Sequence, residues 1–230
     1  TEFYSPSNKT KDIYLKEDLK NITLYLSNLA NSISSILFEL CYKEILIKHK
    51  IEKTACKYVM FSLGKLGGNE LNYSSDIDLV VFYDKNSLIN KKINYNQILS
   101  ETILLFIETA SKKTGAGFLY RVDFRLRPDG RNAPLCGSYS DYIRYYETRG
   151  EDWERQMLIK ANYLCGSKSL YKNFVNSVSS FCVPLIFVLR ISIKPKSPFL
   201  TVNTAISASA PTLKFPRSGL LITLAGCQVV

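Results

Sequence analysis

Three aspartates in two apolar stretches are the residues of this chain best suited to hold a cation. Asp76 and Asp78 open the apolar run 79–82, which predicts a buried strand. Alternate residues of a strand point to one face, so both carboxylates project the same way. Two like charges held close are costly without a cation, and Mg²⁺ favours one or two carboxylates plus phosphate oxygens. Taken alone, such a pair is more often two capping or loop residues.

The third aspartate, Asp123, lies in the alternating stretch 118–126, which predicts a second strand. Its apolar face would hold Tyr120, Val122, Phe124 and Leu126, and its charged face Arg121, Asp123, Arg125 and Arg127. A carboxylate among guanidinium groups suits a metal–phosphate site. The alternatives are a surface salt-bridge ladder, or arginines paired with Glu147, Glu151 or Asp129.

A glycine-rich loop precedes the first aspartates and follows a short apolar run at 58–61 that predicts another strand. Gly64, Gly67 and Gly68 permit positive φ and close approach of the backbone to a ligand. Successive amide groups in such a turn can cradle a phosphate, with help from Lys65. The loop has neither the P-loop nor the dinucleotide-binding glycine order, and alone it would be a plain strand-to-helix turn.

Three segments together resemble the motifs of the glutamine synthetase adenylyltransferases, which belong to the DNA polymerase beta-like nucleotidyltransferase superfamily. The segments are 64–79, 120–130 and 145–161. The family usually has glycine where Ser62 stands. Its full-length proteins are several times longer, so the resemblance implies that this chain is a fragment.

The resemblance implies a Mg²⁺-dependent nucleotidyltransferase with Asp76, Asp78 and Asp123 as catalytic and metal-holding residues. The nucleotide- and phosphate-binding residues would be Gly64, Lys65, Gly67, Gly68, Ser75, Arg125 and Arg127. The implied partners are glutamine synthetase, ATP or ADP and phosphate, and a PII-type signalling protein for the full-length protein.

The family carries two catalytic halves. Its N-terminal half removes AMP from a tyrosine of glutamine synthetase by phosphorolysis, and its C-terminal half attaches AMP from ATP. The order Arg127-Pro128-Asp129-Gly130 resembles the N-terminal half, since the other usually reads Arg-Pro-Ser-Gly. The alternatives are the adenylyl-transferring activity, a nucleotidyltransferase acting on RNA or a small molecule, or an inactive remnant. We expect the fragment itself to be weakly active or inactive.

The apolar patterns predict an α/β chain, a nucleotidyltransferase fold with a small mixed sheet and packed helices. We expect a frayed N-terminus at 1–16, a partial nucleotidyltransferase domain at 17–180, and a divergent tail at 181–230 that is disordered or frameshifted. Long helices are expected at 18–48, 96–112 and 141–160. The first would bury the stripe Leu24, Leu29, Ile33, Ile36, Leu37, Leu40 and Ile47, and the third would be capped by Ser138 or Ser140.

Composition excludes several classes of function. The net charge of +10 comes mainly from residues 155–230, where nine basic residues are scattered without an acidic one, so nucleic-acid binding is not expected. We expect no membrane span, and a cytoplasmic protein with free thiols, because six cysteines lack Cys-x-x-Cys spacing. Trp153, Tyr145 and Tyr146 are expected to pack in the core or between helices.

Overall fold

The structure is a computed structural model that describes residues 18–89, 93–115, 117–189, 212–214 and 221–223. The chain divides into two compact units, residues 1–181 and residues 182–230, and the first holds the sheet and all three motifs. The expected frayed segment 1–16 lies outside the described residues, as does most of the expected tail at 181–230. In the second unit, β8 (Thr212–Lys214) pairs antiparallel with β9 (Leu221–Thr223).

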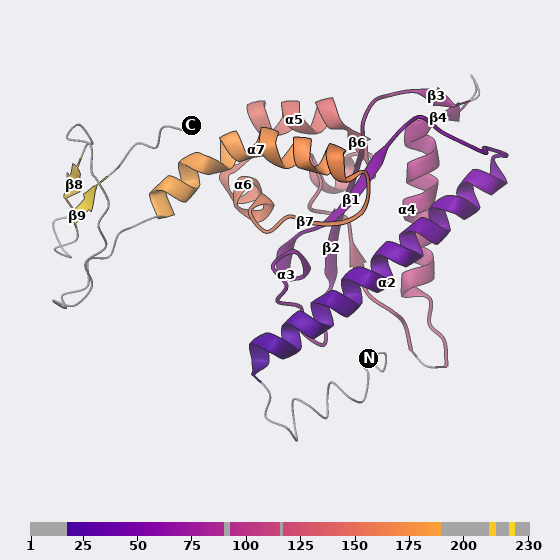
Figure 1. Ribbon diagram of the computed structural model, residues 1–230, viewed down its shortest axis with the longest axis horizontal. Helices are drawn as coiled ribbons and strands as arrows, with labels where there is room; N and C mark the ends of the chain where they lie inside the picture. The colour runs from indigo at the N-terminus through magenta and orange to yellow at the C-terminus, as the bar shows by residue number, and fades with distance from the viewer. Residues whose placement is uncertain (1–17, 90–92, 116, 190–211, 215–220, 224–230) are drawn as a thin grey trace. The chain divides into compact units, whose positions relative to one another are not determined.

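Helices and strands are interspersed along the first unit, whose last helix continues beyond residue 181 (Figure 1). The helices are α2 (Leu19–Lys48), α3 (Gly64–Gly67), α4 (Tyr95–Ser111), the 3-10 turn η1 (Gly130–Asn132), α5 (Tyr139–Thr148), α6 (Asp152–Leu158) and α7 (Lys168–Leu189). The strands are β1 (Tyr58–Ser62), β2 (Ile77–Tyr83), β3 (Leu88–Ile89), β4 (Ile93–Asn94), β5 (Val122–Asp123), β6 (Gly137–Ser138) and β7 (Asn162–Gly166).

The main sheet is mixed and is built around β1 and β2. Its order is β5-β2-β1-β7, with β6 pairing β2 as well. β1 is antiparallel to both β2 and β7, whereas β5 and β6 run parallel to β2. β5 pairs the start of β2 and β6 pairs its end, so the segment between them loops out from one sheet edge. The expected α/β class, a small mixed sheet with packed helices, is confirmed.

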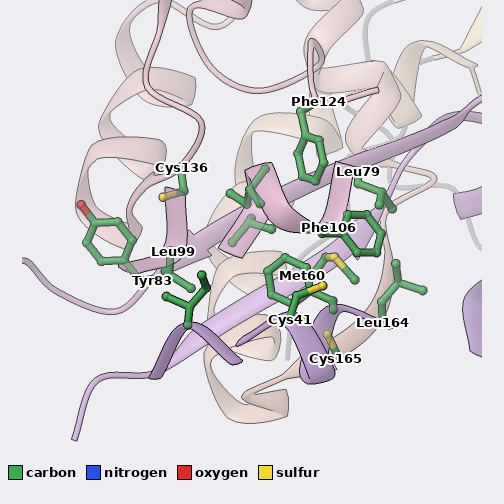
Figure 2. Close-up of a cluster of buried hydrophobic side chains, with 14 of the residues drawn as sticks. Cys41, Met60, Leu79, Tyr83, Leu99, Phe106, Phe124, Cys136, Leu164 and Cys165 are labelled. Atoms are coloured by element: carbon green, nitrogen blue, oxygen red, sulfur yellow. The ribbon is translucent and has the colours of Figure 1, made fainter. Parts of the chain in front are cut away.

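Helices cover both faces of the sheet, which explains why the two central strands are almost wholly apolar. On one face, Phe38 of α2 packs on Tyr58 and on Phe106 of α4. On the other, Phe174 of α7 packs on Phe61 and Phe82. Figure 2 shows the first of these clusters, in which Met60, Leu79 and Phe106 meet buried cysteines. The two central strands are thereby fixed as the rigid base of the site.

The long helix α2 forms as predicted, with Asp18 as its N-cap. Of the predicted buried stripe, Ile33 and Leu37 pack partly buried against the core, but Leu24, Ile36, Leu40 and Ile47 are exposed. The core face consists mainly of Ile22, Leu26, Ala30, Phe38, Cys41 and Ile45. Ile36 and Ile47, assigned to the core from sequence, are 61% and 76% exposed. Apolar residues occupy two faces of this helix, so periodicity alone could not identify the face that packs on the sheet. No helix among the described residues is long and apolar enough to cross a membrane.

Two other predicted elements are shorter than expected. The predicted helix at 141–160 is two helices, α5 and α6, separated at Gly150. A Cβ at Gly150 would lie 3.0 Å from the Cα of Tyr146, so the chain turns tightly there. Ser138 caps α5, as one of the two predicted caps, by accepting a hydrogen bond from the Asp141 amide at 3.2 Å. The predicted strand at 118–126 pairs with β2 only at Val122–Asp123, because the chain turns from Arg125 onward.

Candidate functional site

Two of the three predicted aspartates are cross-strand neighbours. The parallel register pairs Ile77 with Val122 and Asp78 with Asp123, and the Ile77 amide donates to the Arg121 carbonyl at 3.0 Å. Directly paired residues of a pleated sheet point to the same face. Ile77 is fully buried, so the pleat directs the two carboxylates away from the core on that side. β2 and β5 therefore bring Asp78 and Asp123 together from positions 45 residues apart.

Asp78 is the half-buried member of this group. Burial raises the pKa of its carboxyl, and the negative charges of Asp123 and Asp76 raise it further, against a smaller opposing effect of Arg125. Within the described residues, Asp78 makes no ion pair of its own. Its carboxylate thus carries a negative charge that the surrounding side chains do not fully offset.

Arginines neutralise the other two aspartates. The Arg125 amide donates to Oδ1 of Asp123 at 2.7 Å, and Nε of Arg125 donates to Oδ2 at 2.6 Å, with Nη2 also on Oδ2. Hydrogen bonds from Arg125 lower the pKa of Asp123. Arg121 binds Oδ1 of Asp76 through Nε at 2.6 Å and donates to the Ser74 carbonyl at 3.0 Å. Arg121 and Arg125 do form ion pairs, which was the alternative to phosphate binding, but with the site carboxylates rather than with Glu147, Glu151 or Asp129.

The carboxylates offer a pair of donors rather than a closed cage. In the part of the chain that the structure describes, no group of three or more histidine, cysteine, aspartate or glutamate side chains is placed to hold one metal ion. Asp78 and Asp123 remain as two hard oxygen ligands, of which Asp123 is paired with Arg125 and Asp78 makes no ion pair among the described residues. A hard divalent cation needs no more than one or two carboxylates when phosphate oxygens supply the rest.

The glycine-rich loop lies directly against Asp78. Gly64 has φ +56°, and a Cβ built on it would collide with Oδ2 of Asp78. Glycine is therefore required there both for the backbone conformation and for the approach of the carboxylate. Lys65 and Ser75, both predicted to contact phosphate, meet at 3.4 Å between Nζ and Oγ. The loop and the aspartates thus form one contiguous group.

Gly67 and Gly68 are occupied by contacts within the protein. A Cβ at Gly67 would collide with the Lys160 carbonyl and lie 2.8 Å from the Ser62 carbonyl. The amides of Gly67 and Gly68 donate to the carbonyls of Leu63 and Gly64 at 2.8 and 3.1 Å. The structure therefore gives Gly67 a packing role, whereas the amides of Gly64, Lys65 and Leu66, in the first turn of α3, have no helical acceptor four residues earlier.

Ser62, which departs from the usual glycine, fits this crowded region. Its side chain is fully buried, and its Oγ donates to the Asn162 carbonyl of β7 at 3.3 Å. The added hydroxyl therefore joins β1 to β7 and does not obstruct the loop.

Arg127 lies apart from the other predicted phosphate ligands. Its side chain is 6% exposed, in contrast to the alternation that placed it beside Arg125. The guanidinium donates to four backbone carbonyls, those of Phe124, Arg131, Ala133 and Pro134, at 2.7 to 3.2 Å. Arg127 therefore organises the loop between β5 and β6, and its donors are used within the protein.

A network that the sequence did not predict supports this loop from the third motif. Arg149 binds Asp129 at 3.0 Å and lies 5.1 Å over the ring of Tyr145. The Tyr145 hydroxyl donates to the buried Glu154. Burial is the largest of the causes that raise the pKa of Tyr145 to about 12, and Glu154 is the next largest. Glu154 also accepts from the Glu151 amide at 2.8 Å, so the Glu-x-x-Glu spacing was the available signal.

Two further features lie outside this group. The expectation that Trp153 packs in the core was wrong, since it is 56% exposed, whereas Tyr146 is fully buried. A cavity of about 500 Å³ lies between α4, α5 and the loop, and none of the three aspartates lines it. This cavity is therefore separate from the carboxylate group.

Comparison with known proteins places this sequence in a family. Residues 9–177 match the sequence profile of glutamate–ammonia ligase adenylyltransferase. The chain belongs to that family. The match includes every predicted site residue, from Gly64 to Arg127, together with the network around Glu154.

Curated relatives within the family carry a fuller description. The bifunctional glutamine synthetase adenylyltransferase/adenylyl-removing enzyme of Rhizobium meliloti is 38% identical over 140 residues, 60% of this chain and 14% of the relative. The protein of the same name from Bartonella henselae is 40% identical over 124 residues, 54% of this chain and 13% of the relative. The chain thus spans about a seventh of the length of these relatives.

Proposed function

We propose that Asp78 and Asp123 hold the metal ion of a Mg²⁺-dependent nucleotidyltransferase site that removes AMP from glutamine synthetase, with Asp76 adding negative charge beside them. The observation that carries the proposal is the register pairing of Asp78 with Asp123, which leaves Asp78 with uncompensated negative charge. The hard oxygen donors and this charge fit Mg²⁺. Bound there, Mg²⁺ would neutralise phosphate charge and polarise the reacting phosphoryl group.

The chain's own residues would position the phosphates. Gly64 lets the loop approach the carboxylates, and the amide groups of the first turn of α3 and the Lys65 ammonium are donors for phosphate oxygens. Ser75 lies within reach of Lys65. The exposed guanidinium of Arg125 is the flexible cation nearest to Asp123. We leave Gly67, Gly68 and Arg127 out of direct phosphate binding because contacts within the protein occupy their groups.

We propose phosphorolysis as the direction of the reaction. An oxygen of inorganic phosphate bonds to the phosphorus of the tyrosine-linked AMP, the bond from that phosphorus to the tyrosine oxygen breaks, and the tyrosine oxygen takes up a proton. The products are ADP and unmodified tyrosine. The support is the Arg-Pro-Asp-Gly motif at 127–130 and the two exposed arginines beside the carboxylates, whose guanidinium forks suit a second phosphate group.

The test combines ligand binding with turnover. Calorimetric titration of the 230-residue chain should give Mg²⁺-dependent ADP binding, and Asp78→Asn and Asp123→Asn should abolish it without unfolding the chain. Prolonged incubation with adenylylated glutamine synthetase should release ADP only when phosphate is present. Consumption of ATP with release of pyrophosphate and no dependence on phosphate would reverse the proposed direction. Metal-independent ADP binding would overturn the site.

A further inference from the structure

Arg125 occupies the oxygens through which Asp123 would hold a metal ion. Oδ1 of Asp123 accepts from the Arg125 amide, and Oδ2 accepts from Nε and Nη2 of the same residue. The Asp123 side chain is only 11% exposed, so little other access to these oxygens exists. The Arg125 side chain is 54% exposed and no other partner holds its guanidinium among the described residues.

The charge balance of the site also disfavours a metal ion while both arginines stay in place. Asp76, Asp78 and Asp123 carry three negative charges, and Arg121 and Arg125 return two positive ones through their ion pairs. The site is therefore almost neutralised by its own arginines, with one negative charge left over. A dication added with both arginines in place would make the cluster positive, whereas a dication arriving with phosphate would not.

We propose that Arg125 is an exchangeable counter-ion of Asp123, which moves from the carboxylate to a phosphate group when metal and phosphate bind together. This inference rests on the proposed function, since it assumes that Asp78 and Asp123 hold the metal. The backbone hydrogen bond from the Arg125 amide to Oδ1 stays in place, so Oδ2 is the atom released. The exposed side chain can turn without disturbing the core.

Exchange of this kind couples the two ligands. Phosphate draws Arg125 from Asp123 and frees Oδ2 for the metal, and the metal in turn displaces Arg125 toward phosphate. By linkage, each ligand must raise the affinity of the other by the same factor. Metal alone should bind weakly, and the protein would hold Asp123 protected from stray cations until a phosphate compound arrives.

Mn²⁺ binding to the 230-residue chain, followed by electron paramagnetic resonance, tests the inference without turnover. With inorganic phosphate present, the dissociation constant for Mn²⁺ should fall by about fivefold or more after subtraction of a protein-free blank. In Arg125→Gln, Mn²⁺ alone should bind about two- to fivefold more tightly than to the parent chain, because the competing cation is gone. Phosphate should then change that affinity less than about twofold.

Arg144→Gln is the matched control, because Arg144 forms an ion pair of the same kind with Asp141 at 2.6 Å outside the site. It should behave as the parent chain. If Arg125→Gln binds Mn²⁺ no more tightly and keeps the full phosphate effect, the exchange is wrong and the metal site stands. If Asp78→Asn and Asp123→Asn leave Mn²⁺ binding unchanged, the proposed function itself fails. Circular dichroism confirms that each variant is folded.

Discussion

Arginine has opposite roles in two neighbouring regions, the carboxylate site around Asp123 and the loop that follows it. Arg125 and Arg127 are two residues apart, and a strand pattern would place both on one face. Arg125 is exposed on a carboxylate, whereas Arg127 is buried among four carbonyls. The difference shows that an arginine in such a motif can either stay available to a ligand or hold the backbone together. The turn after Phe124 determines which of the two roles each arginine has.

The largest expected effect comes from making the same change at both positions. Arg127→Met should lower the free energy of unfolding by about 3 kcal/mol or more, because several buried carbonyls lose their donor. Arg125→Met should lower the urea midpoint far less, since the side chain is exposed and only its ion pair with Asp123 is lost. Urea unfolding followed by circular dichroism measures both. Equal midpoints for the two variants would remove the distinction.

Gly67 belongs with Arg127 in the supporting scaffold. Gly67→Ala should cost about 1–3 kcal/mol, because the added methyl group meets the carbonyls of Lys160 and Ser62. Gly115→Ala is the matched control, since no atom lies within 4 Å of a Cβ built there. Thermal unfolding of the two variants measures the difference. A stable Gly67→Ala chain that loses only phosphate binding would return Gly67 to the ligand site.

Ionisation of Asp78 should make the stability of the folded chain depend on pH. Its raised pKa means that ionisation destabilises the folded chain, so the cost is absent below the unfolded-state pKa, grows between the unfolded-state and folded-state pKa, and is constant above the folded-state pKa. Asp78→Asn should therefore be more stable than the parent at pH 7 in metal-free buffer, and the advantage should vanish near pH 3. Urea unfolding across this range tests the sign. A parent chain more stable than the variant at pH 7 would contradict it.

Glu101 should give the smallest effect and the opposite sign. It accepts from Lys48 and His49, at 2.8 and 2.9 Å, and these bonds lower its pKa to about 2. The stabilisation is present above the unfolded-state value near 4.5 and is lost as pH falls toward 2. Glu101→Gln should cost about 0.5 kcal/mol at pH 7, a typical value for a surface pair. A loss that persists unchanged at pH 2 would refute this origin.

The sequence predicted the parts of this molecule that depend on local pattern. Alternation placed Asp123 opposite the apolar residues Tyr120 and Phe124, and continuous apolar runs predicted β1 and β2. Nothing local could show that Asp78 pairs directly with Asp123, since strand register depends on tertiary packing. The same limit explains the wrong face of α2, where both apolar stripes satisfy a helical period and only the sheet selects one.

Arg127 and Gly67 mark the second limit. Both lie inside motifs that the sequence predicted to bind phosphate. A residue that binds phosphate and one that only supports the fold can have the same type and the same place in such a motif. Only burial separates the two, and the low exposure of Arg127, 6%, follows from a turn that alternation does not encode.

The buried cysteines can report how often the core of this chain opens. Cys41, Cys56, Cys136 and Cys165 are buried, the first, third and fourth of them in the cluster that Figure 2 shows. Burial raises the pKa of Cys136 and Cys165 to about 12. The thiolate is the nucleophile that attacks a thiol reagent, so these groups should react only after the core opens. With Cys182 and Cys227 replaced by serine, the labelling rate of the remaining thiols would report how often the sheet and its helices separate, with no added probe.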